Sequence, residues 1–226
     1  MAFRLIIFDL DGTLIDTIRD LGAAVDHTLS LRGLGGHSIQ DYKSMVGHGV
    51  RELVRKALPR DLSSDDATID ECLSDFKSFY TNNIDRYTRP YAGIPELLSE
   101  LQESGVHLAV ASNKFQAGTE YLVKRFFPAI HFDAILGNRD GFPLKPSPEI
   151  VEEALRASGV GREDTVLVGD SPTDMRTAAA GGIKAIAVGW GYRDASDLLS
   201  TGASLPAGTL HSLVTSVPDL RRLLLD

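Results

Sequence analysis

The sequence is poor in cysteine and in positive charge, and it contains no long apolar run. Its single cysteine, Cys72, excludes an intramolecular disulfide and a cysteine-based zinc site, and we expect this thiol to be half-buried on a helix. Acidic residues outnumber basic ones by 31 to 23, which gives a net charge of −8. This balance argues against a nucleic-acid or anionic-membrane surface, because both need a basic patch.

No stretch approaches the roughly 20 apolar residues that a membrane-spanning helix needs. The N-terminal apolar run is interrupted by Asp9 and Asp11, where a signal peptide would continue apolar. We therefore expect a soluble, cytoplasmic protein without nucleic-acid or membrane partners. The sequence leaves open whether the protein is a monomer or a homodimer.

The chain has 226 residues, 43% of them hydrophobic, which suits one α/β domain with an inserted subdomain. Residues 16–89 place apolar side chains at helical spacing and contain no convincing strand. The helices expected in this block cover residues 17–31, 38–45, 48–58 and 65–83.

After residue 90 the pattern changes to strands and helices in alternation, which predicts a parallel sheet with helices on both faces. The expected strands cover residues 106–111, 132–136, 165–168 and 183–188. The expected helices cover residues 94–104, 116–126, 147–158, 172–180, 195–199 and 217–224. The predicted fold class is α/β: a doubly wound, Rossmann-like core of residues 1–15 and 90–226, into which residues 16–89 insert as a helical cap.

Two carboxylates, Asp9 and Asp11, end the first apolar strand, residues 5–10, and Gly12 allows a sharp turn after them. Burying carboxylates is costly unless a cation or hydrogen bonds compensate the charge. In open α/β sheets the carboxyl ends of the strands are also where ligands bind. The motif therefore predicts a metal site with a nucleophile.

Polar residues follow the later strands too. Ser112, Asn113 and Lys114 come after the second core strand, Lys145 lies in the loop after the third, and Asp170 and Asp174 follow the fourth. Parallel topology brings these strand ends to one edge of the sheet. Carboxylate oxygens suit Mg²⁺, while a hydroxyl and a lysine can donate to phosphate oxygens.

These residues, in this order, resemble the motifs of the haloacid dehalogenase superfamily. Asp9-Leu10-Asp11-Gly12-Thr13 is similar to its first motif, Ser112 to its second, Lys145 to its third, and Asp170 with Asp174 to its fourth. The resemblance covers nearly the whole chain, including a helical cap inserted after the first strand. Taken singly, Ser112, Lys145 and Asp174 could each be an ordinary turn, loop or helix residue.

The resemblance implies a phosphatase or phosphomutase that forms an aspartyl-phosphate on Asp9. It makes Asp11 the general acid and base, which excludes a dehalogenase, because dehalogenases have no acid two residues after the nucleophile. Mg²⁺ would be held by Asp9, the Asp11 backbone carbonyl and Asp170, while Asp174 would hold a metal-bound water or orient a lysine. The same resemblance assigns the phosphate contacts to Lys145, Ser112, Asn113 and Thr13.

The cap segment 46–58 resembles that of phosphoglycolate phosphatases, and residues 188–193 resemble a glycine-aromatic stretch of the same enzymes. Gly47 and Gly49 expose backbone amides at a helix start, which suits an anion. Arg51 could pair with a substrate carboxylate, or it could belong to a solvated helix face. His48 could contact substrate or simply lie on the surface.

The sequence therefore predicts a Mg²⁺-dependent phosphatase of a small phosphorylated metabolite, with 2-phosphoglycolate favoured. A pyrophosphatase and a β-phosphoglucomutase-like enzyme are the alternatives. A phosphonate hydrolase would need a Schiff-base lysine in the cap, and neither Lys43 nor Lys56 has a convincing context. A non-enzymatic binding protein is disfavoured because no catalytic group is missing.

Overall fold

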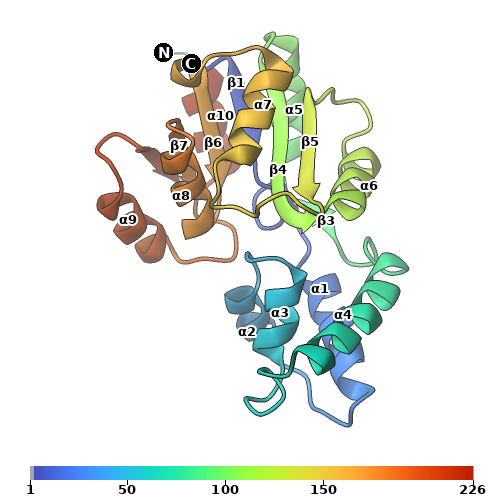
Figure 1. The fold of residues 1–226 in the computed structure, drawn as a ribbon. Coiled ribbons are helices and arrows are strands. Elements are labelled where there is room, and N and C mark those ends of the chain that lie inside the picture. The colour runs from blue at the N-terminus through green and yellow to red at the C-terminus, as the bar shows by residue number, and fades with distance from the viewer. Residues whose placement is uncertain (1–2, 226) are drawn as a thin grey trace.

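A sheet of parallel strands forms the centre of the protein in the computed structural model, which describes residues 3–225 (Figure 1). Within these residues the sheet has six strands in the order β5-β4-β1-β6-β7-β8. Its strands are β1 (Leu5–Phe8), β4 (His107–Phe115), β5 (Ala134–Asn138), β6 (Thr165–Gly169), β7 (Lys184–Val188) and β8 (Leu210–Val214). All five neighbouring pairs are parallel.

Helices cover both faces of this sheet. Alternate residues of β1 point to opposite sides, so Leu5 and Ile7 belong to one buried cluster while Ile6 and Phe8 belong to the other. Helices α7 (Glu149–Ser158) and α8 (Pro172–Ala180) pack on the first side. The other side is covered by α5 (Ile94–Glu103), α6 (Gln116–Phe126) and α10 (Val217–Leu225). This arrangement confirms the predicted doubly wound α/β fold.

Four helices lie together beyond the carboxyl ends of the strands, and we call them the cap helices (Figure 1). They are α1 (Ile18–Ser30), α2 (Ile39–Met45), α3 (Val50–Ala57) and α4 (Asp66–Thr81). The structure begins α2 with a capping box between Ser38 and Asp41, and Asp65 caps α4 by accepting from the Thr68 backbone N–H. No helix among the described residues is long and apolar enough to span a membrane.

Two short strands connect the cap helices to the core, although no strand was predicted there. β2 (Ile15–Asp16) and β3 (Arg89–Pro90) pair antiparallel, at the predicted boundaries between core and cap. Beside them, the buried Asp20 accepts hydrogen bonds from the Thr88 hydroxyl and from the backbone N–H groups of Tyr87 and Thr88. This carboxylate therefore fixes α1 to the chain segment that returns to the core.

Four further features differ from what the sequence predicted. The predicted strand 106–111 continues to Phe115, so Ser112, Asn113 and Lys114 lie within β4 rather than after it, where its pairing with β5 shifts register. Strand β8 was not predicted; its sequence, Leu-His-Ser-Leu-Val, is only partly apolar because it lies at the edge of the sheet. Cys72 is completely buried, since it lies on the side of α4 that faces the other cap helices. The helix α9 (Ala195–Ser204) also runs further than expected.

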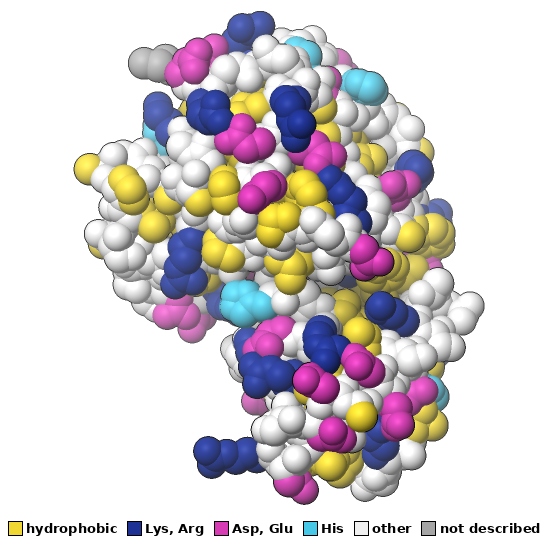
Figure 2. Space-filling view, viewed as in Figure 1, with side chains coloured by type: hydrophobic (Ala, Val, Ile, Leu, Met, Phe, Trp, Pro, Cys, Tyr) yellow, Lys and Arg dark blue, Asp and Glu magenta, His cyan; other side chains and the backbone are white. Residues whose placement is uncertain are grey.

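The surface in Figure 2 intersperses Lys and Arg with Asp and Glu, and no large patch of one sign covers this face.

Candidate active site

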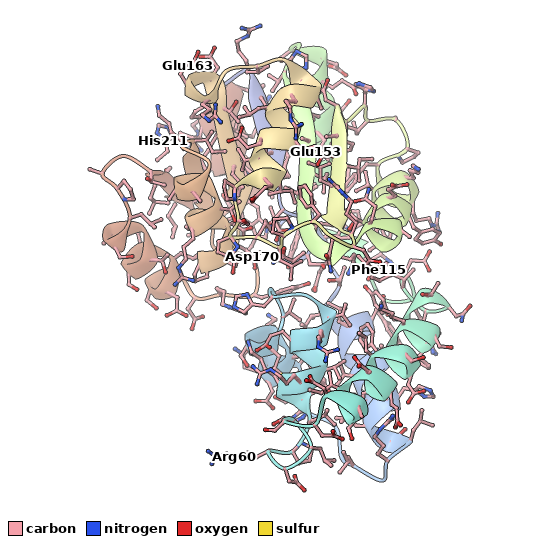
Figure 3. The ribbon with its side chains drawn as sticks, viewed as in Figure 1. Arg60, Phe115, Glu153, Glu163, Asp170 and His211 are labelled. Carbon is pink, nitrogen blue, oxygen red and sulfur yellow. The ribbon has the colours of Figure 1, made fainter. Side chains whose placement is uncertain are left out.

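Strand register brings the predicted site residues together at the carboxyl ends of the strands. Phe8 pairs with Val110 on one side and with Val168 on the other, so the residues that follow these three positions in the chain lie close to one another. The Asp9 backbone N–H donates to the Val168 carbonyl at 2.9 Å. In Figure 3, Asp170 lies at the carboxyl ends of the strands, which is the end of the sheet next to the cap helices.

The turn after Asp9 needs a glycine. Gly12 has φ +93°, and a Cβ there would lie 2.5 Å from Asp170 Oδ2. The next residue, Thr13, is fully buried, and its hydroxyl lies 3.2 Å from Asp170 Oδ1. Thr13, which was expected in the phosphate cradle, is thus placed as a hydrogen-bond donor to a carboxylate.

Three buried carboxylates crowd together next to this turn. Asp9, Asp170 and Asp174 each offer an oxygen, and these oxygens all lie within 4.8 Å of one another. Burial and the neighbouring carboxylates raise the pKa of Asp9, and the same two causes raise the pKa of Asp170 to about 7. A cation would compensate this crowded negative charge, and an all-oxygen donor set suits a hard divalent ion such as Mg²⁺. Asp11, whose backbone carbonyl was predicted as a ligand, does not contribute its carboxylate to this cluster.

Lys145 joins two of these carboxylates. Its ammonium lies 2.8 Å from Asp9 Oδ1, 2.7 Å from Asp174 Oδ1 and 2.7 Å from the Ala111 carbonyl. Burial alone would lower the pKa of Lys145, but Asp174 and Asp9 outweigh it, and the pKa is raised. The second oxygen of Asp174 accepts from Ser171 in a capping box at the start of α8. Asp174 is thus paired with Lys145, and its two predicted roles, holding a metal-bound water or orienting a lysine, stay predictions.

Two hydrogen bonds from Asn113 hold the loop that carries Lys145. Its side-chain oxygen accepts from the Lys145 backbone N–H at 2.8 Å, and its amide donates to the Lys145 carbonyl at 3.1 Å. The same amide donates to the Gly47 carbonyl in the cap at 2.9 Å. Asn113, expected to bind phosphate, has its amide group bonded to protein partners. Ser112 is buried in the pocket lining, and its hydroxyl accepts from the Lys114 backbone N–H.

Both oxygens of the Asp11 carboxylate have partners. Oδ1 accepts from the Thr17 hydroxyl at 2.7 Å, and Oδ2 lies 3.0 Å from the ammonium of Lys114. Lys114 also donates to the Tyr80 hydroxyl, which comes from α4 of the cap. Lys114 was expected near this strand end without an assigned role. Alternation along the strand was the available signal, because it places Lys114 on the same face as Ser112.

A pocket that is partly open to solvent lies between these groups and the cap helices. Its core side carries the charged and polar residues described above. Its cap side carries only apolar side chains and glycine, namely Leu21, Val46, Gly47, Gly49, Val50 and Leu53. The pocket therefore joins a charged floor to an apolar roof.

The glycine-aromatic stretch after β7 attaches the roof to the floor. Tyr192 donates its backbone N–H to Asp170 Oδ2 at 2.7 Å, and its hydroxyl accepts from the Thr17 backbone N–H. Arg193 donates to the carbonyls of Lys43, Ser44 and Val46 at the end of α2. This segment thus touches both a carboxylate of the cluster and the cap.

The structure does not bring Arg51 to the pocket. Its guanidinium pairs with Asp66 at 2.8 Å and with Asp70, both on α4, and the side chain is 47% exposed. Of the two alternatives for Arg51, these ion pairs on the solvent side favour the solvated helix face, and the substrate contact stays a prediction. His48 Nδ1 lies 3.4 Å from the Thr173 hydroxyl, between cap and core.

A family model described as haloacid dehalogenase-like hydrolase matches residues 6–188. The chain belongs to this family. It is 38% identical over 196 residues to a phosphoglycolate phosphatase of Mesorhizobium japonicum, covering 86% of each chain, and 34% identical to one of Aquifex aeolicus, covering 84% of this chain and 86% of the other. A crystal structure from Lactobacillus delbrueckii subsp. bulgaricus has a TM-score of 0.89 and 29% identity over 99% of both chains. The predicted family and enzyme class, a haloacid dehalogenase-like phosphatase, are confirmed.

Proposed function

We propose that this phosphatase hydrolyses 2-phosphoglycolate, with Mg²⁺ as cofactor and an aspartyl-phosphate on Asp9 as intermediate. The observation that carries the proposal is that two aspartates of the same pocket, Asp9 and Asp11, have different hydrogen-bond partners. Asp9 belongs to the carboxylate cluster and is held by Lys145, whereas Asp11 lies outside the cluster and is held by Thr17 and Lys114. Distinct surroundings suit distinct roles for two neighbouring carboxylates.

Asp9 would act as the nucleophile. A carboxylate oxygen of Asp9 forms a bond to phosphorus while the bond from phosphorus to the ester oxygen breaks. Lys145 holds Asp9 in place and contributes positive charge beside the phosphoryl group. The structure around Lys145 supports this role, because two carboxylates and a carbonyl fix its ammonium.

Asp11 would move the protons. It gives a proton to the leaving alkoxide, and in the second half it takes a proton from the water that attacks phosphorus. Inorganic phosphate then leaves and the Asp9 carboxylate is restored. Such transfers contribute roughly 10²- to 10⁴-fold in rate. The bonds from Thr17 and Lys114 support the role by fixing the orientation of the Asp11 carboxylate.

Asp9, Asp170 and Asp174 would hold Mg²⁺, together with the backbone carbonyl of Asp11. When bound, the cation would neutralise charge that develops on the phosphoryl oxygens. Their crowding and the raised pKa values of Asp9 and Asp170 fit this function, because the cluster needs positive charge when it is ionised.

The apolar roof favours a small leaving group over a sugar. No polar side chain from the cap helices lines the pocket in the described part of the chain. The hydroxyls of a sugar phosphate would lose water there and find few partners, which costs about 1–3 kcal/mol for each unsatisfied group. Glycolate has no additional hydroxyl. The names of the relatives from Mesorhizobium japonicum and Aquifex aeolicus favour the same substrate.

Phosphate release by the purified protein tests this proposal on 2-phosphoglycolate, pyrophosphate, nucleoside monophosphates and sugar phosphates. We expect 2-phosphoglycolate to have the highest kcat/KM and the activity to be lost after chelation and restored by Mg²⁺. A preference for pyrophosphate, or formation of an isomeric sugar phosphate, would contradict the substrate assignment. Full phosphate release from an Asp9→Asn variant without Mg²⁺ would contradict the mechanism.

A further inference from the structure

Three cationic side chains line the pocket within the described chain: Lys114, Lys145 and Arg193. They differ in how many of their N–H donors already have protein partners. This difference decides which of them can bind a group of the substrate, because a donor that is already bonded must lose its partner first.

Lys145 has no donor left, and Arg193 is directed at the cap. All three N–H donors of Lys145 are accounted for by Asp9, Asp174 and the Ala111 carbonyl. Arg193 keeps two of its five N–H donors, but its three hydrogen bonds hold the guanidinium at carbonyls of the cap at the end of α2, and none goes to Asp9 or Asp11 in the described chain. Lys145 is also the lysine that belongs to the phosphoryl site.

Lys114 retains a donor. An ammonium has three N–H donors, and the described residues supply two acceptors, Asp11 Oδ2 at 3.0 Å and the Tyr80 hydroxyl at 2.9 Å. The Lys114 side chain is only 2% exposed, yet the residue lines the pocket. The ion pair with the Asp11 carboxylate compensates the charge of the buried ammonium. A buried cation with an unused donor suits an anionic group of a ligand.

We propose that Lys114 binds a carboxylate on the alcohol part of the substrate and selects phosphate esters of 2-hydroxy acids, an inference that rests on the proposed phosphatase function. Lys114 Nζ lies 3.0 Å from Asp11 Oδ2, beside the carboxylate that would protonate the ester oxygen. A group bound by Lys114 must therefore be attached close to that oxygen. The carboxylate of a 2-hydroxy acid sits on the adjacent carbon and meets this condition.

Tyr80 is the positioning residue of this arrangement. It is fully buried on α4, and its ring stacks on that of Phe76 with 5.3 Å between the ring centroids. Its hydroxyl accepts a hydrogen bond from the Lys114 ammonium. Lys114 is thus held between Asp11 of the core and Tyr80 of the cap. Arg51, the cation that the sequence suggested for this task, is paired with Asp66 and Asp70 outside the pocket.

The test compares two esters on the same protein preparation: 2-phosphoglycolate and ethyl phosphate, in which a methyl group replaces the carboxylate. We expect Lys114→Met to lower the ratio of their kcat/KM values by roughly 10- to 100-fold, the size expected for a lost hydrogen bond to a charged group. The KM for 2-phosphoglycolate should rise, while the KM for ethyl phosphate should change little. Because both esters meet the same active fraction, a folding defect cancels in the ratio.

Tyr80→Phe is a milder second variant that removes one hydroxyl from a buried, well-packed ring. It should lower the same ratio by about 2- to 10-fold. Lys124→Met is the matched control, because Lys124 is 70% exposed on α6 and pairs with Glu120 far from the chemistry of the pocket. The ratio should be unchanged in this control.

An equal loss of activity on both esters in Lys114→Met would overturn the inference and leave Lys114 with the sole task of orienting Asp11. An unchanged ratio in both pocket variants would also overturn it. A wild-type ratio near one would refute carboxylate recognition while the phosphatase function stands. Wild-type protein that hydrolyses neither ester would overturn the proposed function itself, and this inference with it.

Discussion

The floor and the roof of the pocket differ in the polarity of their side chains. On the floor, Asp9, Asp174 and Lys145 are buried and bonded to one another. On the roof, the cap helices offer apolar side chains and glycine, and their charged residues pair with each other on the outer surface, as Arg51 does with Asp66. In the proposed function the floor would perform the chemistry, whereas the roof would cover the substrate and limit its size.

The two regions also differ in what a lost ion pair should cost. Removing one partner of a buried pair leaves an uncompensated charge, which is strongly destabilising or disabling. Exposed pairs are screened by water and contribute little. Substitutions on the floor should therefore have large effects, and substitutions of paired charges on the cap surface should have small ones.

The largest effect is expected for Asp9→Asn. Without the nucleophile, kcat should fall by roughly 10⁴-fold or more. The metal-free variant should melt no lower than the wild type, because Lys145 keeps Asp174 as its partner. In addition, burial and neighbouring carboxylates raise the pKa of Asp9 and make its charge unfavourable in the folded state. Steady-state kinetics and thermal denaturation in chelator measure the two effects. Substantial residual turnover would show that another group attacks phosphorus.

Gly191→Ala should disturb the floor without changing any charge. A Cβ at Gly191 would lie 2.3 Å from Asp170 Cβ, so the carboxylate must move. We expect the Mg²⁺ concentration for half-maximal activity to rise about 10- to 100-fold, as for other residues that orient metal ligands. Gly35→Ala is the control, because no atom lies within 4 Å of its added Cβ. Equal magnesium dependence in the two variants would argue against Asp170 as a ligand.

Arg193→Gln should weaken the connection between roof and floor. The variant loses the guanidinium that donates to the Lys43, Ser44 and Val46 carbonyls, so the cap should close less often over the substrate. We expect kcat/KM for 2-phosphoglycolate to fall about tenfold, the size of one lost charged hydrogen bond, mainly through KM. The exposed Arg176→Gln serves as control. A fall confined to kcat would instead indicate a contact with the reacting group.

The smallest effect is expected for Arg51→Gln. Because the guanidinium pairs with Asp66 and Asp70 at the surface, its removal should change kcat/KM by less than about twofold. The same kinetic assay measures it, at low and at high salt. A loss above tenfold would restore the substrate contact that the sequence suggested for Arg51.

Much of the core could be predicted because its signals are local. The alternation of apolar runs and amphipathic segments predicted α6 and α8 with their observed ends. Strand β8 was missed because a partly exposed edge strand has no clear apolar run. The pair β2–β3 was missed because two residues per strand are too few to show a period.

The candidate site also has a part that could be predicted from the sequence and a part that could not. The grouping of Asp9, Lys145, Asp170 and Asp174 could be predicted, because parallel strands deliver their carboxyl ends to one edge. The partners of Asn113 could not, since they are a carbonyl of the cap and a loop backbone that is 32 residues away. The alternatives for Arg51 stayed open for a related reason: its acidic partners lie on another helix, and helical periodicity does not specify how two helices face each other.

The sequence by itself thus determined the family, the doubly wound sheet and the carboxylates and lysine at its edge, because order along parallel strands translates directly into position. Only the tertiary structure decided which cations remain available in the pocket. Donor capacity depends on contacts between distant segments, such as that of Lys114 with Asp11 and Tyr80, and no local pattern in the chain records them.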